Sequence, residues 1–502
     1  MADILLGQGY FLRFDPKLWR ARQPYPPLGS LYAAAVLRQA GHDVAVFDSM
    51  LARSEDEWAQ AVARHQPRFA VLYEDSFNYL SKMCLLRMRE AALRMLRMAK
   101  GRGARVIVAG ADASDHPQLY LEAGAAFVVT GEGEATLLEL LDALRGRAKT
   151  APQAMAGLAF RTADGACHRT VPRPFIKDPD ALPSPAWDLI DIERYRRVWR
   201  EGHGYFSMNL VTTRGCPYHC NWCAKPIYGQ RYVARSPEAV ADEIAFLKAR
   251  FAPDHLNFVD DIFGLTPGWV ERFAEVMRSR GLVTPFKCLS RADLLSEPVV
   301  RALAAAGCRT LWVGAESGSQ RILDAMEKGI RVEQIHAAAH RLRDAGIEVG
   351  FFLQFGYPGE TREDVENTLA LVRECRPDDI GISISYPLPG TKFHERVSLQ
   401  MGEKRNWRDS DDLDMMYPGP FGTAFYRSLY CVAHKEFRIR KLRDEIASGG
   451  VRSLLALAYH AATLPLARSR MERAARAPHE GLGPLPVELK PEAAARPTEQ
   501  PL

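Results

Sequence analysis

Three cysteines in one short segment are the residues of this sequence most able to do chemistry. Cys216, Cys220 and Cys223 lie close together, although the whole chain has only 9 cysteines in 502 residues. The segment 212–223, TTRGCPYHCNWC, spaces them as C-x3-C-x2-C. Three thiolates on one loop can each hold one iron of a 4Fe–4S cluster, and with no fourth cysteine nearby the fourth iron stays open. An open metal position can bind a chelating substrate.

Two other uses of the cysteines were weighed. A structural zinc site needs four ligands, and His219, placed between two of the cysteines, would strain the loop if it served as one. A disulfide needs an oxidising compartment, which nothing in the sequence suggests. The spacing therefore favours an iron–sulfur cluster.

Residues 206–400 repeat a strand–helix unit at least six times, and the cysteine segment comes directly after the first strand. Six sequential units predict a partial or complete parallel barrel, in which chemistry takes place at the carboxyl ends of the strands. The candidate strands are 208–213, 256–260, 285–290, 310–316, 349–356 and 380–386, and the helices are 236–250, 266–280, 296–306, 319–327, 332–345 and 361–374.

This arrangement, with an aromatic residue before the last cysteine, resembles the radical S-adenosylmethionine (SAM) superfamily over about 200–400. In that family the open iron binds the amino and carboxylate groups of SAM, and one electron from the cluster cleaves SAM to a 5′-deoxyadenosyl radical. The segments 259–264, 290–293, 314–320, 355–361 and 386–391 resemble the family's later strand ends.

The resemblance implies SAM contacts from Trp222, Asp260, Asp261, Arg291, Glu316 and Ser317. Many members carry Gly-Gly-Glu after the second strand, where this chain has Val-Asp-Asp. The alternative for the two aspartates is a helix N-terminal cap, and the alternative for Arg291 is a surface ion pair.

Residues 1–150 also alternate short apolar runs with helical patterns. They predict a Rossmann-like, doubly wound parallel sheet that binds ligands at the carboxyl ends of its strands. No G-x-G-x-x-G follows the first strand, which argues against a dinucleotide. The candidate strands are 4–7, 43–48, 69–74, 104–110 and 125–131, and the helices are 26–41, 80–100, 117–123 and 134–145.

The segments 26–48 and 106–141 resemble the cobalamin-binding domain that is fused to one large radical SAM subclass. The resemblance implies cobalamin contacts from Gly110, Ala111, Thr130, Gly131, Glu132, Gly133 and Glu134. A plain helix cap is the alternative for the Gly-Glu-Gly-Glu run. The D-x-H-x-x-G loop of cobalamin mutases is missing, and Asp115-His116 has the wrong spacing, so we expect cobalamin with no protein histidine on cobalt.

The expected order is a cobalamin-binding domain at 1–150, a hairpin and linker at 151–205, the radical SAM partial barrel at 206–400, a helical region at 401–475 and a disordered tail at 476–502. The segment 451–477 is apolar and basic but too polar to span a bilayer. Packing on the body of the protein is favoured over contact with a membrane surface, which stays open.

Composition limits the partners and the compartment. With 47% hydrophobic and 25% charged residues the chain is globular, and its net charge of +5 argues against nucleic acid as a partner. No stretch reaches the roughly 18 apolar residues of a membrane span. Asp3 stands where a signal peptide would carry a basic residue, which predicts a cytoplasmic protein.

The leading hypothesis is a cobalamin-dependent radical SAM methyltransferase that methylates an unactivated carbon through the 5′-deoxyadenosyl radical and methylcobalamin. Its partners would be a small-molecule, lipid or tetrapyrrole substrate and an electron donor such as flavodoxin or ferredoxin. The alternative is a non-methylating oxidoreductase or cyclase, which resembles the anaerobic magnesium-protoporphyrin IX monomethyl ester cyclase in domain order. A non-catalytic iron–sulfur or zinc scaffold is the third hypothesis. A tRNA methylthiotransferase is disfavoured because no small all-β RNA-binding domain is evident.

Overall fold

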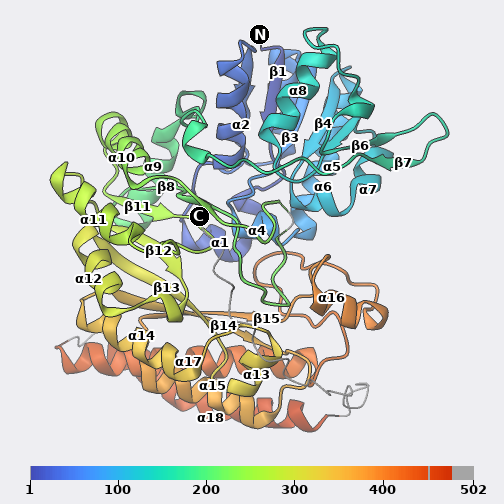
Figure 1. Cartoon of the computed structure of the whole chain (residues 1–502). Coiled ribbons are helices and arrows are strands. Elements are labelled where there is room, and N and C mark those ends of the chain that lie inside the picture. The colour runs from blue at the N-terminus through green and yellow to red at the C-terminus, as the bar shows by residue number, and fades with distance from the viewer. Residues whose placement is uncertain (1, 226, 450–452, 478–502) are drawn as a thin grey trace.

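The computed structural model describes residues 2–225, 227–449 and 453–477, which form two parallel α/β halves (Figure 1). The first sheet has the order β2-β1-β3-β4-β5-β6-β7, and its first five strands are parallel. This confirms the doubly wound fold, with the flavodoxin-like strand order. The strands are β1 (Ile4–Gly7), β2 (Val44–Val46), β3 (Phe69–Tyr73), β4 (Arg105–Ala109), β5 (Phe127–Val129), β6 (Leu158–Arg161) and β7 (Cys167–Arg169).

The hairpin expected in the linker belongs to this first sheet. Strand β6 pairs antiparallel with β5, so that Val128 lies opposite Ala159, and β7 extends the sheet by one more strand. The connector is also not devoid of structure, because a helix, α9 (Ile192–His203), precedes the second sheet. Sequence reasoning overlooked α9 because only three of its side chains are buried.

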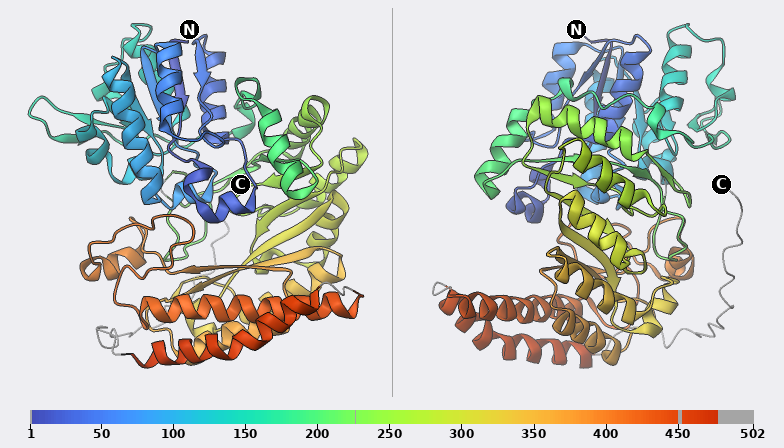
Figure 2. Two further views of the ribbon diagram at one scale, coloured as in Figure 1. Left: turned by 180° about the vertical axis from the view of Figure 1, so that it is seen from behind. Right: turned by 60° about the vertical axis from the view of Figure 1, so that its left-hand side comes forward.

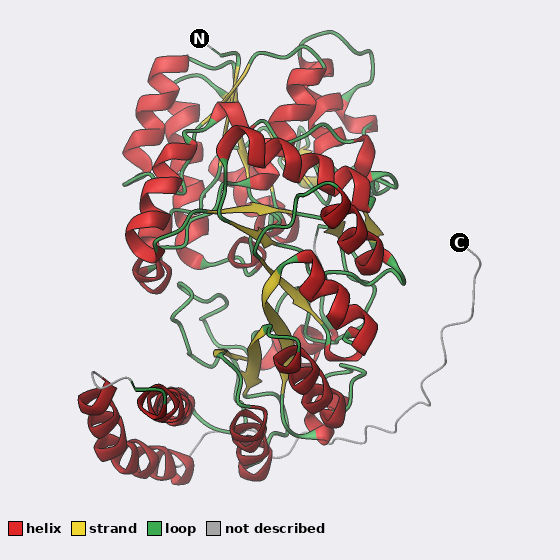
Figure 3. Cartoon of the chain, turned by 90° about the vertical axis from the view of Figure 1, so that its left-hand side faces the viewer, coloured by secondary structure: helices red, strands yellow, loops and turns green. Residues whose placement is uncertain are grey.

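Helices cover both faces of the first sheet (Figure 3). Helix α3 was not predicted, because its sequence EDEWAQAVARH has few large apolar residues; Ser54 caps it and three acidic residues occupy its first turn. The helices of this half are α1 (Pro16–Ala21), α2 (Leu28–Gln39), α3 (Glu55–His65), α4 (Tyr79–Lys82), α5 (Leu86–Gly101), α6 (Ala111–Asp115), α7 (Pro117–Ala123) and α8 (Glu134–Leu144).

The second sheet is the expected (β/α)6 partial barrel. Its strands are all parallel, in the order β15-β14-β13-β12-β11-β8. They are β8 (Ser207–Leu210), β11 (His255–Phe258), β12 (Phe286–Ser290), β13 (Cys308–Glu316), β14 (Glu348–Phe355) and β15 (Asp379–Ile384). The helices are α10 (Pro237–Phe251), α11 (Trp269–Ser279), α12 (Glu297–Ala306), α13 (Gln320–Ala325), α14 (Val332–Asp344) and α15 (Arg362–Cys375).

A short ribbon and three C-terminal helices complete the fold. Strands β9 (Thr213–Arg214) and β10 (Val233–Ala234) pair antiparallel next to the cysteine segment. Helices α16 (Lys392–Val397), α17 (Thr423–Ala447) and α18 (Leu454–Arg476) follow the barrel, and α17 and α18 lie side by side at the end of the molecule remote from the first sheet (Figure 2). The tail expected at 476–502 lies, from residue 478 on, outside the described residues. In the part of the chain that the structure describes, no helix is long and apolar enough to cross a membrane.

The two halves share one hydrophobic core. A single cluster of buried side chains contains Leu31 and Tyr32 of α2 together with Leu210 and Phe258 of the barrel. Polar contacts reinforce it, since the Trp199 indole donates to the carbonyl of Pro24 at 2.7 Å. The two halves are therefore packed as one body, and this packing fixes how their facing edges lie relative to each other.

Candidate functional site

Asp260, at the end of β11, anchors the start of the cysteine segment. Its Oδ1 accepts the backbone N–H groups of Thr212 at 2.7 Å and Thr213 at 2.6 Å, and both threonine hydroxyls donate to the same carboxylate. Burial raises the pKa of Asp260 to about 6, while these hydrogen bonds lower it. These bonds give Asp260 a role in positioning the start of the cysteine segment, and its expected SAM contact stays a prediction.

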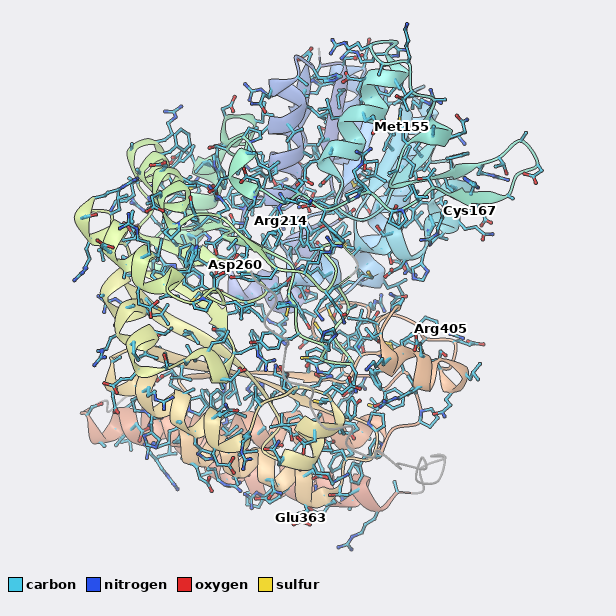
Figure 4. All side chains as sticks on the ribbon, viewed as in Figure 1. Met155, Cys167, Arg214, Asp260, Glu363 and Arg405 are labelled. Carbon is cyan, nitrogen blue, oxygen red and sulfur yellow. The ribbon has the colours of Figure 1, made fainter. Side chains whose placement is uncertain are left out.

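Arg214, two residues before the first cysteine, joins this segment to the first half of the chain. Its Nη1 lies 2.6 Å from Oε1 of Glu132, and its Nη2 lies 2.8 Å from Oε1 of Glu134. The three side chains are only 4%, 6% and 4% exposed. The rings of Tyr32, Phe77 and Tyr228 surround the guanidinium. Figure 4 shows Arg214 and Asp260 near each other between the two halves.

The remainder of the segment is also fixed by the protein itself. Gly215 has φ +81°, and a Cβ there would lie 2.3 Å from the carbonyl oxygen of Arg231, so only glycine fits. At the other end, the Asn221 amide donates to the carbonyl of Ala325 at 2.8 Å and accepts the Tyr357 hydroxyl at 2.8 Å. The backbone that carries the cysteines is thus held at both ends.

The three cysteines are half-buried and form no disulfide. Burial raises the pKa of Cys216, and that of Cys223 to about 12; Cys220 raises both further, and Cys216 also raises that of Cys223. Among the described residues no three His, Cys, Asp or Glu side chains converge on one point as for a single metal ion. A 4Fe–4S cluster does not need this, because each thiolate binds a different iron. Three adjacent thiols without a fourth ligand therefore fit such a cluster better than zinc.

A group of charged side chains lies next to Cys220. Nη1 of Arg291 is 3.9 Å from the Cys220 Sγ, and the guanidinium stacks 3.6 Å above the ring of Tyr218. Arg291 also pairs with Asp293 at 3.0 Å, so it is a buried ion pair and not a surface one. Arg291 thus lies beside the cysteine segment, and its expected contact with the SAM carboxylate stays a prediction.

Glu316 carries backbone strain at the end of β13. It has φ +59°, which non-glycine residues rarely adopt, and strain of this kind clusters at functional sites. Its Oε1 accepts from Lys328 Nζ at 2.8 Å, and both side chains are 7% exposed. Sequence reasoning missed Lys328; its signal is a lysine directly after the short helix that follows this strand end. Charges of both signs therefore meet beside Cys220.

Trp222 and Ser317, two further residues expected to contact SAM, have different surroundings. Trp222 lies in the cysteine segment, and its buried Nε1 has no hydrogen-bond partner in the described ranges. Ser317 is fully buried against α15, where its hydroxyl meets that of Thr368 at 3.1 Å. Trp222 is thus open to a ligand, whereas Ser317 holds the fold together.

Helix α4 of the first half reaches the barrel site. Asp261 accepts from Lys82 Nζ at 2.5 Å. The pKa of Tyr79 is raised by the surrounding protein and by Cys223, Glu316 and Asp261, although its side chain is 58% exposed. Tyr79 is therefore an exposed residue of the first half that lies within electrostatic range of the cysteine segment. Tyr79 and Lys82 were not expected from the sequence.

The residues expected to contact cobalamin lie at the carboxyl edge of the first sheet. Protein packing explains several of them. A Cβ at Gly110, with φ +141°, would lie 2.5 Å from the Cβ of Glu74, and one at Gly133 would lie 2.8 Å from the Tyr73 hydroxyl oxygen. Ala111 is buried at the start of α6, Thr130 donates its N–H to Gly157, and Gly131 donates to the Ser114 hydroxyl at 3.2 Å. Glu132 and Glu134 bind Arg214, as described above.

Three more polar side chains lie at the same edge; Glu74 is at a strand end where the sequence predicts ligands, whereas Gln8 and Tyr10 were not singled out. Gln8 Nε2, Tyr10 Oη and Glu74 Oε2 are buried, and none of these atoms has a hydrogen-bond partner within the described part of the chain. Glu74 Oε1 accepts the Gly9 N–H at 2.8 Å, and burial raises the pKa of Glu74 to about 8. Burying unpaired polar groups is costly, so these atoms indicate a polar ligand at the ends of β1 and β3. The signal was a cluster of polar residues after each of the two strands.

The inner face of the barrel is not a packed core. Outward residues of the strands are buried and mostly apolar, whereas the alternating inward positions carry polar and aromatic side chains, among them Asn209, Asn257, Lys287, Trp312, Phe352 and Gln354. The Asn209, Asn257 and Gln354 side-chain oxygens have no partner that the structure describes. Such a face is suited to a ligand, because closed barrels fill it with branched apolar residues. The period-two alternation in these strands was the overlooked signal.

Comparison with known proteins agrees with this geometry. Residues 210–372 match the Radical SAM superfamily, and residues 19–141 match the B12 binding domain. The chain thus contains a radical SAM domain preceded by a B12 binding domain. This combination is that of a cobalamin-dependent radical SAM enzyme, and the scaffold hypothesis loses its support.

Three similar proteins are informative. An uncharacterized methyltransferase of Pyrococcus horikoshii is 29% identical over 397 residues, which are 78% of this chain and 82% of the relative. The anaerobic magnesium-protoporphyrin IX monomethyl ester cyclase of Rubrivivax gelatinosus is 26% identical over 58% of this chain, which spans about half (52%) of that enzyme. The radical SAM methyltransferase TsrM of Kitasatospora setae has the same fold, with a TM-score of 0.64 and 21% identity over 80% of this chain and 75% of TsrM.

The buried contact of Arg214 makes a stability prediction. Replacing Arg214 with Met leaves Glu132 and Glu134 buried without a cation, which costs about 3–5 kcal/mol of unfolding free energy. Adding Glu132→Gln and Glu134→Gln removes the uncompensated charges and restores part of the loss. Urea unfolding monitored by circular dichroism measures both. A triple variant no more stable than Arg214→Met contradicts this account.

The three cysteines predict the metal content. After anaerobic reconstitution with iron and sulfide, Cys220→Ala should lose most of the iron that the wild type retains, because two thiolates hold a cluster poorly. The matched control is Cys431→Ala, which changes an exposed cysteine on α17 and keeps its iron. Iron analysis with electron paramagnetic resonance measures the outcome. If both variants retained equal amounts of iron, the cysteine segment would not be the cluster site.

The raised pKa of Glu74 predicts a pH dependence of stability in the cofactor-free protein. Because burial raises this pKa from 4.5 to about 8, the protonated form is favoured in the folded state. The contribution of Glu74 is complete below about pH 4.5 and falls, by up to about 1.4 kcal/mol per pH unit, until about pH 8. The unfolding free energy of Glu74→Gln lacks this decline. Parallel pH profiles for variant and wild type would refute the prediction.

Proposed function

We propose that the protein is a methyltransferase that transfers a methyl group to an unactivated carbon of a small molecule. The observation that carries the proposal is the Arg214 contact, which holds the cysteine segment against the carboxyl edge of the B12 binding domain. Radical and methyl-transfer chemistry at one substrate carbon require the two cofactors to face a shared space. The similarity to a Pyrococcus methyltransferase over most of both chains gives further support.

The charged side chains of the site and its buried polar atoms without a hydrogen-bond partner indicate which residues would hold each cofactor. Cys216, Cys220 and Cys223 would bind the cluster. Arg291, Glu316, Lys328 and Trp222 would receive SAM, and Gln8, Tyr10 and Glu74 would donate to or accept from the polar groups of cobalamin. When bound, SAM on the cluster would supply the 5′-deoxyadenosyl radical, and cobalamin would supply the methyl group.

The protein's own side chains would orient the cofactors and control charge. Arg291 presents a cation at Cys220, and its stacking on Tyr218 fixes the direction of its donors. Lys328 neutralises Glu316, and a ligand amino group could take the place of Lys328 without leaving a buried carboxylate unpaired. Tyr79 would cover the site from the first half of the chain.

The inner face of the barrel would bind the substrate. Lys287 makes no ion pair or hydrogen bond with any residue in the described ranges, and burial lowers its pKa. Trp312 and Phe352 lie on the same face, nearer the carboxyl ends of the strands. Their rings stack with centroids 4.6 Å apart, and Phe352 is exposed. A molecule with an anionic group for Lys287 and an apolar or ring-shaped body for the two aromatic rings fits this surface.

We further propose that the protein works in the cytoplasm and receives its electron from a flavodoxin or ferredoxin. An oxygen-sensitive cluster suits a reducing compartment, and the cluster requires a one-electron donor. The second candidate function is oxidation or cyclisation without methyl transfer. The similarity to the Rubrivivax cyclase favours it as the alternative.

Isotope labelling distinguishes the two functions. The reconstituted protein is incubated without oxygen with a reductant, SAM that carries a trideuterated methyl group, and a metabolite extract of the source organism. Methyl transfer yields 5′-deoxyadenosine, S-adenosylhomocysteine and a product with the trideuteromethyl label in its mass spectrum. A product without the label supports the cyclase alternative, and the absence of 5′-deoxyadenosine refutes both.

Lys287→Met tests the substrate position in the same assay. Loss of the cation should lower the labelled product about 100-fold, as removal of a buried charge partner does, and leave iron content and substrate-free SAM cleavage unchanged. The matched control is Lys392→Met, a lysine paired with Glu327 on the surface. If Lys287→Met and the wild type gave equal amounts of labelled product, the substrate would not bind at this face.

A further inference from the structure

Helix α18 turns an uncharged, apolar face to solvent. Between Leu454 and Ala467 it contains no Asp, Glu, Lys or Arg. Four large apolar side chains of this stretch are exposed: Leu454 at 51%, Leu455 at 86%, Tyr459 at 61% and Leu466 at 51%. A surface helix normally presents polar residues to water, so this face has the composition of a binding surface.

The two C-terminal helices also carry the positive charge of the protein. Helices α17 and α18 contain ten lysines and arginines and four acidic residues, a net charge of +6. The whole chain has a net charge of only +5. The remainder of the protein is therefore nearly neutral, and the basic residues gather beside the apolar face.

Several of these basic residues have no acidic partner. Arg470 and Arg473 of α18 and Arg438 and Arg443 of α17 are exposed, and none of them forms an ion pair with a residue that the structure describes. Arg468, by contrast, pairs with Glu436 at 2.6 Å. Exposed, unpaired arginines next to an apolar stripe suit a surface that is apolar inside and negatively charged at its boundary.

The position of α18 leaves its outer face free. Helix α17 is tied to α15 through Arg373–Glu436 and Arg376–Asp444, and α18 packs on α17 through Ala467 and Met471. Figures 1 and 2 show both helices at the end of the molecule away from the first sheet and α4. The expected packing on the body is thus present on one side of α18 only.

We propose that the outer face of α18, formed by Leu454, Leu455, Tyr459 and Leu466 and bordered by Arg470 and Arg473, binds the surface of an anionic phospholipid bilayer. The apolar side chains would enter the interfacial region, and the arginines would meet the lipid phosphates. A nucleic acid would use the arginines but not the leucines. A second copy of the chain would bury the leucines but bring two sets of arginines together. The inference does not depend on the cofactor chemistry.

Vesicle flotation of the full-length protein tests the proposal. We expect the protein to float with vesicles of phosphatidylcholine that contain about a third phosphatidylglycerol, and not with phosphatidylcholine alone. High salt should weaken the binding, because the arginine contribution is screened. Leu455→Glu with Tyr459→Glu should lower the bound fraction about tenfold, since the apolar contact is lost and two negative charges repel the lipid.

A matched control tests whether the effect depends on where the two negative charges are placed or only on the change in net charge. Val171→Glu with Leu399→Glu introduces the same two charges at residues that are 70% and 99% exposed elsewhere, and it should bind vesicles like the wild type. Hydrogen exchange on the wild type should show protection of 454–467 by anionic vesicles, which tests the surface without any substitution. The proposal is overturned if the wild type does not float, or if both double variants bind equally. It is also overturned if 454–467 is protected instead by a concentration-dependent dimer.

Discussion

The buried contact between Arg214 and the two glutamates is the constraint on which the rest of the site depends. A guanidinium enclosed at 4% exposure is tolerated only because Glu132 and Glu134 neutralise it and three aromatic rings surround it. Because each of its two terminal nitrogens binds a different glutamate, the guanidinium can rotate little. This fixes the direction in which the cysteine segment, which begins two residues later, leaves the interface. A chain segment that belongs to the barrel is in this way held by the other half, and the cofactor edges of the two halves cannot drift apart.

Around this contact, each end of the cysteine segment is fixed by groups that would otherwise be read as ligand contacts. Asp260 uses all its acceptor capacity on two threonines, and Asn221 uses its amide on α13 and Tyr357. Rigid support of this kind lets three thiols stand ready for a cluster without reorganisation. The candidate cofactor contacts fall at two places. Beside Cys220 lie Trp222, whose Nε1 has no partner in the described residues, and the ion-paired side chains Arg291, Glu316 and Lys328. At the edge of the first sheet lie Gln8, Tyr10 and Glu74, each with a polar atom that has no partner in the described residues.

The inner face of the barrel and the outer face of α18 are both exceptions to the usual distribution of polarity. The strands place polar and aromatic residues inward, where closed barrels pack aliphatic ones, and the helix places leucines outward, where polar residues are usual. Each exception has a stability cost, and each is the basis of a proposal: a substrate on the inner face of the barrel, and a contact outside the catalytic reaction on α18.

The sequence alone determined the two α/β halves, the six strand–helix units and the cysteine segment, because hydrophobic periodicity and ligand spacing are local properties of the chain. It did not determine which acidic residues face a cofactor. Glu132, Glu134, Asp260 and Ser317 were expected at ligands, and each also has a partner in the protein at least 45 positions away, while Lys328 was unforeseen. Hydrogen-bond and ion-pair partners are set by which strand ends and helices meet in space. Only the tertiary structure decides whether a polar group is already paired or still available to a ligand.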